Sequence, residues 1–315
     1  MEAFPCLPTI KSFCTNPSEL YPGSKTLDFH NKAAGHERRL AMYLAENFRL
    51  SPNMGLEEWV YLTQLCQVEA MSYAYRGWRR QWEGRKCGGA LVWQLNDSWP
   101  GISWSIVDYY LRKKPAYYVI KRCLASIAIG VQRRHHDWSV AHAIPEKQSN
   151  WDCWVVSSLM ESVTAVVEVR FVSIGTGKDI KQPLVMKNIR LRRNGLTEVC
   201  KGVVDNEKEE PHVLAARLWI DGEAVARDCD WPQPLKYLDF SEREARRIDV
   251  LEDRENEKIL LRARQPTKCV VLEERDGLWL SDNALDVVPG DEQIVFAKGL
   301  DKITSTLGWK YLSNA

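Results

Sequence analysis

The chain has 315 residues, of which 45% are hydrophobic and 27% are charged, and its formal net charge at pH 7 is +1. This composition is typical of a globular protein with about two or three domains. A net charge near zero gives no electrostatic attraction to nucleic acid or to an anionic membrane. No apolar run reaches the ~20 residues that a membrane span needs. We therefore expect neither nucleic acid nor a membrane as a partner.

The cysteines and the N-terminal residues indicate a compartment. Nine cysteines are scattered along the chain without a C-x-x-C pair, and Met1–Cys6 lacks the basic and apolar regions of a signal peptide. Both features favour reduced thiols and a cytoplasmic location. The thirteen tryptophans could be rigid core residues or stacking platforms for sugar rings. Composition alone favours the core.

The first part of the chain is predominantly helical. Apolar residues at three- and four-residue steps predict a helix from about residue 33 to 50 and a second from about 55 to 82. A short helix over 116–125 follows Pro115, and one helical turn is expected near Thr9. The basic cluster Arg76, Arg79, Arg80, Arg85 and Lys86 is interpreted as a solvated helix end, and anion binding is the alternative.

The stretch Gly88–Gly101 joins a short apolar run to polar and aromatic side chains. Two glycines precede Ala-Leu-Val-Trp, and Gln94, Asn96 and Asp97 follow among tryptophans. A glycine-bounded apolar run predicts a strand buried on both faces, as in a parallel sheet. α/β and barrel enzymes place ligand contacts just past the end of such strands. One strand makes no sheet, so we expect this part to belong to something larger.

From Ile127 the hydrophobic period changes from helical spacing to two. Four strand-like runs, separated by turn signals, lie between residues 128 and 219 and predict a β-sandwich over about 128–230. Trp231-Pro232-Gln233-Pro234 reads as a stiff linker. Five shorter runs between 248 and 296 predict a second, smaller sandwich.

Two segments have metal-like residues. His135-His136-Asp137 is disfavoured as a metal site because adjacent strand side chains point to opposite faces. Asp282, Asn283 and Asp286 could ligate calcium, but the spacing is not that of an EF-hand, and a loop that satisfies its own backbone is favoured. We expect neither a metal nor a cofactor.

Five segments together resemble the β-mannosidases of glycoside hydrolase family 2, which also holds β-galactosidase and β-glucuronidase. The similarity is closest to the fungal intracellular type. The most specific motif is W-Q-L-N-D-S-W-P at 93–100, followed by S-W-S-I-V-D-Y-Y at 103–110. The other segments are 28–32 with 35–39, 231–237 and 281–286. The resemblance covers essentially the whole chain.

The resemblance implies an α/β plus all-β fold, namely the terminal portion of a (β/α)8 barrel followed by two immunoglobulin-like β-sandwich domains. The expected domains are 1–126 for the barrel portion, 127–232 for the first sandwich and 233–315 for the second. In the family, a jelly-roll domain and an immunoglobulin-like domain precede the barrel. This chain resembles only the last part.

The resemblance also places the catalytic residues. Retaining glycosidases use two carboxyl groups about 5–5.5 Å apart. In the family the nucleophile is a Glu in a Ser-Glu-Phe-Gly segment after the seventh barrel strand, and the acid/base Glu lies further upstream. Met1–Pro5 resembles the segment that follows the nucleophile, and Glu2 lacks the required preceding Ser. We therefore expect no catalytic residue in this chain.

The candidate substrate-binding residues are Trp93, Asn96 and Asp97. The resemblance implies that Trp93 lines the sugar-binding subsite at the end of the eighth barrel strand, and core packing is an even alternative. Asn96 and Asp97 would contact hydroxyls or orient loops, and the second role is favoured because Asx side chains readily cap loops.

The implied function belongs to carbohydrate metabolism and polysaccharide catabolism. The parent enzyme would remove terminal non-reducing β-D-mannose from β-mannoside oligosaccharides, and this chain would be a truncated form without activity of its own. The alternative is a non-catalytic β-sandwich fragment that binds carbohydrate or a partner. The oligomeric state is left open.

Overall fold

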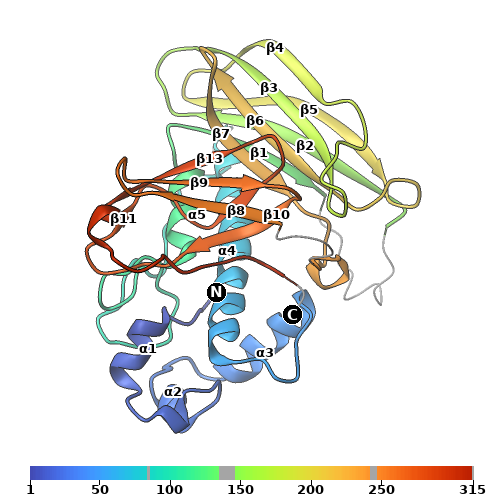
Figure 1. The fold of residues 1–315 in the computed structure, drawn as a ribbon. Helices are drawn as coiled ribbons and strands as arrows, with labels where there is room; N and C mark the ends of the chain where they lie inside the picture. The colour runs from blue at the N-terminus through green and yellow to red at the C-terminus, as the bar shows by residue number, and fades with distance from the viewer. Residues whose placement is uncertain (84–85, 135–145, 242–246, 314–315) are drawn as a thin grey trace.

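The computed structural model describes residues 1–83, 86–134, 146–241 and 247–313 (Figure 1). Helices occupy the first part and strands the remainder. The helical elements are α1 (Leu7–Phe13), η1 (Pro17–Glu19), α2 (Lys25–Phe29), α3 (His36–Asn47), α4 (Leu56–Arg80) and α5 (Pro115–Cys123). The predicted helices correspond to α1, α3, α4 and α5 and are confirmed; α2 was not predicted.

Helix α4 is the longest element and the centre of the arrangement. Glu57 and Glu58 lie in its first turn, Arg79 and Arg80 in its last, so that both ends suit the helix dipole. Its buried residues pack against α5 and against both β regions. Helix α5 begins at Pro115, whose missing N–H costs nothing in a first turn.

The first β region is a sandwich of seven strands. One sheet has the order β1-β2-β5 and the other β4-β3-β6-β7, with antiparallel pairing throughout. The inner faces enclose a core that includes Trp151, Phe171 and Leu214. The strands are β1 (Ile127–Arg133), β2 (Gln148–Ser157), β3 (Thr164–Ser173), β4 (Leu184–Arg190), β5 (Gly195–Asp205), β6 (His212–Ile220) and β7 (Glu223–Asp230).

The second β region is a smaller sandwich. Its sheets have the orders β11-β13-β9-β8 and β12-β10-β14. Tyr118 of α5 packs into its core, which ties this sandwich to the helical part. The strands are β8 (Ile248–Asp253), β9 (Lys258–Ala263), β10 (Thr267–Leu272), β11 (Trp279–Leu280), β12 (Leu285–Val287), β13 (Gln293–Lys298) and β14 (Trp309–Lys310), with η3 (Leu235–Tyr237) before them and η4 (Leu300–Lys302) between β13 and β14.

Both predicted sandwiches are present, but several of their strands were not predicted from the sequence. Strand β4 lies at a sheet edge, where most of its side chains are exposed, and β7 is largely polar. Without a buried face, such strands carry no clean two-residue hydrophobic period. Within the described residues, no helix is both long and apolar enough to cross a membrane.

Candidate functional site

The stretch Gly88–Gly101 does not form the buried strand expected from its sequence. The structure assigns no strand to this stretch: residues 94–97 share backbone hydrogen bonds with Ile106 and Val107, including the bridge between Asn96 and Val107, so the prediction is wrong. Leu91, Trp93 and Leu95 are 97%, 76% and 55% exposed. Burial still alternates with a period of two, since Val92, between the exposed Leu91 and Trp93, packs against the core. A strand needs neighbours, and the described residues offer this stretch no sheet.

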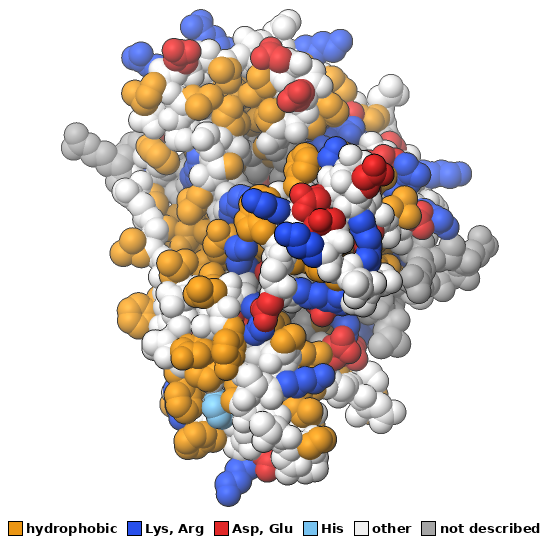
Figure 2. Space-filling view, turned by 60° about the vertical axis from the view of Figure 1, so that its left-hand side comes forward, with side chains coloured by type: hydrophobic (Ala, Val, Ile, Leu, Met, Phe, Trp, Pro, Cys, Tyr) orange, Lys and Arg blue, Asp and Glu red, His pale blue; other side chains and the backbone are white. Residues whose placement is uncertain are grey.

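Trp93 thus points to solvent and is not packed in a core. Figure 2 shows hydrophobic side chains gathered along the left and lower part of one face of the molecule. Large exposed apolar groups on consecutive outward positions mark a surface that a partner, a ligand or further protein can cover.

Asp97 is buried and organises its own loop. Its two carboxylate oxygens accept hydrogen bonds at 2.6 Å from the hydroxyls of Ser103 and Ser105. Gln94 Nε2 donates to the same carboxylate at 3.3 Å. Asp97 therefore fixes the backbone between 94 and 105, which agrees with the favoured structural role.

Asn96 is exposed next to this buried carboxylate. Its Nδ2 donates to the backbone carbonyl of Asp97 at 3.2 Å, and the residue pairs with Val107 in the bridge. The three candidate residues lie in one loop, but their side chains have different surroundings. Trp93 and Asn96 face solvent, while Asp97 faces inward.

Two further buried groups, Asp108 and Lys114, join the residues that follow this loop to the N-terminal segment. The Asp108 carboxylate accepts from the hydroxyl of Thr9 and from the N–H groups of Tyr110 and Arg112. Lys114 Nζ donates to the carbonyl of Ala3 at 3.0 Å, and burial lowers the pKa of Lys114 to about 8.

Glu2 is engaged in the same way. It is 4% exposed, accepts from Asn31 Nδ2 at 3.3 Å and lies 3.5 Å from the guanidinium of Arg39. Glu2, Asp97 and Asp108 thus each contact local partners, although Glu2 Oε2 accepts no hydrogen bond from the described residues.

An aromatic cluster beside this loop was missed by the sequence reading. The His30 ring stacks between Phe13 and Trp99, with ring centroids 4.0 and 5.0 Å away. His30 Nδ1 also lies 2.7 Å from the carbonyl oxygen of Pro100, so the ring anchors the turn after Asp97. Phe29 packs edge-on against both His30 and Trp99 and is 63% exposed. The D-F-H-N-K segment was noted only as part of the resemblance, although its aromatic content could have indicated this contact.

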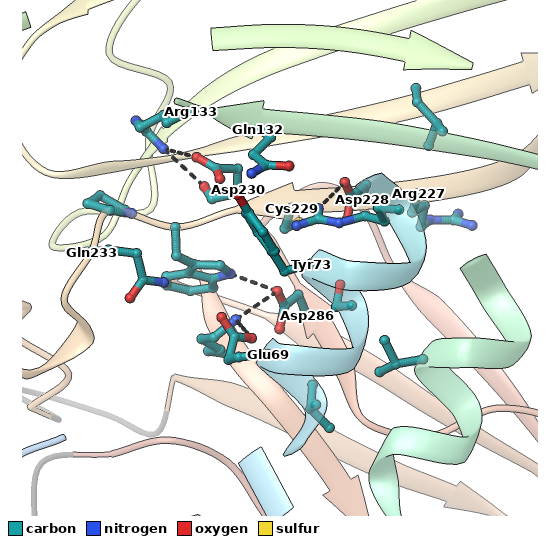
Figure 3. A pocket seen from close by; sticks show the side chains of 18 of the residues that line it. Glu69, Tyr73, Gln132, Arg133, Arg227, Asp228, Cys229, Asp230, Gln233 and Asp286 are labelled. Carbon is teal, nitrogen blue, oxygen red and sulfur yellow. Dashed lines mark hydrogen bonds and ion pairs between the residues drawn. The ribbon is translucent and has the colours of Figure 1, made fainter. Parts of the chain in front are cut away.

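A second feature is a cleft of about 600 Å³ where α4 meets the two sandwiches. Figure 3 shows Tyr73 of α4 lying between Asp228 and Asp230 of β7 on one side and Asp286 of β12 on the other. Tyr73 is 52% exposed and Tyr237, at the cleft margin, is 55% exposed. Aromatic faces beside carboxylates and guanidinium groups are surroundings in which a polar ligand with apolar patches can bind.

Most charges along the cleft are paired within the protein. Arg133 Nη1 lies 2.6 Å from the Asp230 carboxylate. Lys268 Nζ, buried to 4% exposure, lies 2.8 Å from Glu69 and 3.5 Å from Asp286, and these carboxylates raise the pKa of Lys268 against the opposing effect of burial. Ion pairs along the cleft thus connect α4 and the two sandwiches.

The basic cluster at the end of α4 belongs to this junction. Arg76 pairs with Asp228, Arg79 Nη1 donates to the carbonyls of Cys123 and Ala125, and Arg80 binds Glu198. The prediction of a solvated helix end is wrong for these three arginines, because the sandwich docks against the end of the helix. Arg85 lies outside the described residues.

The two metal-like segments have different outcomes. His135-His136-Asp137 lies outside the described residues. In the other segment, Asn283 binds the backbone N–H and carbonyl of Leu272 at 2.8 Å, and Asp286 accepts from the indole N–H of Trp231 at 2.7 Å. Asp282 pairs with Arg122. Within the loop, Asp282 and Asn283 accept from the next backbone N–H group, as the favoured interpretation expected, and the other bonds hold the loop against neighbouring segments.

The sequence and the fold of the chain are similar to those of known glycosidases. A family model described as a mannosidase Ig/CBM-like domain matches residues 149–237. The chain is 56% identical over 314 residues to β-mannosidase B of Emericella nidulans and 54% identical to that of Aspergillus oryzae. Each match covers 99% of this chain but 37% of the relative. The chain therefore spans little more than a third of the length of these curated relatives.

Solved structures share the fold. The β-D-mannosidase of Dictyoglomus thermophilum superposes with a TM-score of 0.78 at 24% identity, covering 99% of this chain and 36% of that one. The exo-chitosanase of Amycolatopsis orientalis superposes with a TM-score of 0.66 at 15% identity, covering 98% of this chain and 40% of that one. Over nearly its whole length, the chain is homologous to a section of the fungal β-mannosidase B proteins.

Proposed function

We propose that the chain is part of a retaining β-mannosidase that removes terminal non-reducing β-D-mannose from β-mannosides. The observation that carries this proposal is the 56% and 54% identity to two β-mannosidase B proteins over 99% of the chain. Such identity over 314 residues supports a fold and a chemistry shared with these relatives.

Within this proposal, residues 1–126 are the terminal portion of a (β/α)8 barrel, 127–232 the first sandwich and 233–315 the second. The change from helices to strands at Ile127 and the linker at 231–234 support these boundaries. The helices α3, α4 and α5, beside a segment that lacks strand partners, are what a few barrel units would supply without their neighbouring strands.

Trp93 is proposed as one wall of the mannose-binding subsite, with Asn96 and Asp97 beside it. Its exposed ring and the loop held by Asp97 support this role, because a rigid aromatic face suits the C–H face of a sugar. The chain alone is proposed to be inactive, since it spans 37% of the length of its curated relatives and, by the family resemblance, none of its residues matches either catalytic Glu.

A chimera tests the proposal. The chain would replace the matching section of the Emericella nidulans relative, and hydrolysis of an aryl β-mannoside would be measured for the chimera and for the chain alone. We expect turnover by the chimera and none by the chain. Trp93→Ala in the chimera should lower kcat/KM by about 10–100-fold, the equivalent of the ~1.5–3 kcal/mol that a buried aromatic contact contributes.

Trp279→Ala is the matched control for this experiment. Trp279 is also exposed, at 49%, but lies in β11 of the second sandwich. Its loss should leave kcat/KM unchanged. A folded chimera without turnover would refute the proposed activity, and equal effects of the two substitutions would refute the role of Trp93.

The second candidate function is carbohydrate binding without catalysis. The cleft with Tyr73 and Tyr237 favours it, as does the match of the adjoining sandwich to an Ig/CBM-like family model. Calorimetric titration of the chain with β-1,4-mannobiose should then show binding that Tyr73→Ala weakens and Tyr109→Ala, at an exposed site outside the cleft, does not. Absence of heat at millimolar sugar would exclude this function.

We also propose a cytoplasmic location. All nine cysteines lie in described segments and are free, which is the state that a reducing compartment maintains. Fractionation of the source cells with an antibody against the chain would test the location.

A further inference from the structure

Two cysteines lie directly opposite each other in the first sandwich. Cys153 of the central strand β2 is the register partner of Cys200 of β5, the strand at the edge of this sheet. Directly opposite residues of an antiparallel pair project from the same face. Both side chains face the sandwich core, where Val131 of β1 pairs with Cys153 on its other side.

The spacing of such a pair suits a disulfide. Opposite residues in antiparallel strands have Cα atoms about 4.5 or 5.5 Å apart, and disulfides span about 4.4–6.8 Å. Their Cβ atoms, about 4.5–5.5 Å apart, must approach by roughly 1 Å to reach the mean for a disulfide. The ladder is interrupted immediately beyond the pair, because Trp154 pairs with Glu198 and leaves Val199 as an extra residue. Such a bulge allows β5 to shift locally.

The two thiols differ in access and acidity. Cys153 is fully buried, whereas Cys200 is half-buried at the open edge of the sandwich. A hydrogen bond between the thiols raises the pKa of Cys153, which burial raises further, and lowers the pKa of Cys200. Cys200 is therefore the thiolate that reacts first, because the thiolate is the nucleophile in disulfide exchange.

We propose that Cys153 and Cys200 are a reversible modification site that forms a cross-strand disulfide with a small-molecule disulfide, such as oxidised glutathione, as oxidant. The Cys200 thiolate attacks the oxidant, forming a mixed disulfide and releasing one glutathione thiolate. Cys153 then gives up its proton and attacks the Cys200 sulfur, releasing the second glutathione. The two cysteines are oxidised by two electrons, and one glutathione disulfide is reduced to two thiols.

The bond would pin the edge strand to the centre of its sheet. It closes a loop of roughly 50 residues that contains β3 and β4, so it removes conformational freedom mainly from the unfolded chain. The edge strand β5, which has a free side, would be held against peeling from β2.

Peptide mapping tests the site. The folded chain is incubated with oxidised glutathione, remaining thiols are alkylated, and the digest is analysed by mass spectrometry. We expect a peptide that links Cys153 to Cys200 and disappears after reduction. The linked chain should melt roughly 5–10 °C higher than the reduced chain.

Three variants separate the steps. Cys153→Ser should leave Cys200 carrying one glutathionyl group, while Cys200→Ser should leave Cys153 reduced. The matched control Cys87→Ser removes a half-buried cysteine from a loop and should leave the link intact. Failure of the link to form in the folded wild-type chain, or its formation only in urea, would refute the proposal.

Discussion

The buried ion pair between Arg76 of α4 and Asp228 of β7 offers the sharpest test of how the helical part holds the sandwich. Their side chains are 13% and 14% exposed. Asp228 also accepts from the N–H of Val131 at 2.8 Å, and Arg76 donates to the carbonyl of Val131 at 3.3 Å. The pair thus connects the helix to two strands.

Replacing one partner leaves the other charge buried without compensation. Asp228→Ala removes the partner of Arg76 and the acceptor of the Val131 N–H, and we expect a loss of about 3–5 kcal/mol. At ~2–4 °C per kcal/mol for a chain larger than 150 residues, the Tm should fall by roughly 6–15 °C.

Removing both charges should cost much less. Both pKa values are raised, with opposite effects on the two charges. Asp228 raises the pKa of Arg76 against the effect of burial, which favours the charged guanidinium. Burial raises the pKa of Asp228 in spite of the guanidinium, which disfavours the charged carboxylate. Attraction therefore roughly offsets the cost of burying the carboxylate. The apolar pair Arg76→Met with Asp228→Leu should recover most of the Tm lost in Asp228→Ala.

Differential scanning calorimetry gives the Tm of the single variants, of the double variant and of a control. The control is Glu292→Ala, which removes the partner of Arg262 from an exposed pair with side chains 52% and 47% exposed. Its Tm should change by no more than about 2 °C. Equal Tm values for Asp228→Ala and Glu292→Ala would refute the reasoning, as would a double variant that melts as low as the single one.

Three other predictions concern single sites. Burial lowers the pKa of His212 from 6.5 to about 4, so as the pH falls the unfolded chain binds a proton before the folded chain does. The stability that the neutral His212 contributes is therefore complete above about pH 6.5, and the free energy of unfolding decreases by roughly 3 kcal/mol toward pH 4. His212→Gln should therefore lose less Tm between pH 7 and 4.5 than the wild type in thermal melts, and parallel profiles would contradict this. Gly130→Ala should lower the Tm, because its Cβ would lie 2.4 Å from the Trp154 ring, whereas Gly77→Ala inside α4 should leave it unchanged or raise it. Trp93→Ala should not change the Tm of the chain by more than about 2 °C, since its ring is 76% exposed; a larger loss would mean that the ring is packed.

The helices and both sandwiches could be predicted because their signals are local. The buried side of α4, the alternation of β3 and the continuous apolar run of β6 are patterns of consecutive residues. Edge strand β4 has no such signal, since its side chains face solvent on most positions.

The candidate site could be predicted only in part. Asx chemistry predicted that the Asp97 side chain would bind within its own loop, and its carboxylate does accept from Ser103 and Ser105. The stacking of His30 between Phe13 and Trp99 joins three distant segments and could not be read from any one of them.

The sequence by itself determined which residues form helices and strands and which family motifs the chain carries, because periodicity, turn residues and motif spacing are written along the chain. Only the tertiary structure decided their surroundings. The apolar run up to Trp93 looked buried on both faces, yet Leu91 and Trp93 are exposed, because burial depends on neighbours that no local pattern specifies. The arginines of α4 looked solvated, yet Arg76 is paired with Asp228 of the sandwich and Arg79 is buried against the end of α5. Burial and pairing are properties of contacts between distant segments, and those contacts exist only in the folded chain.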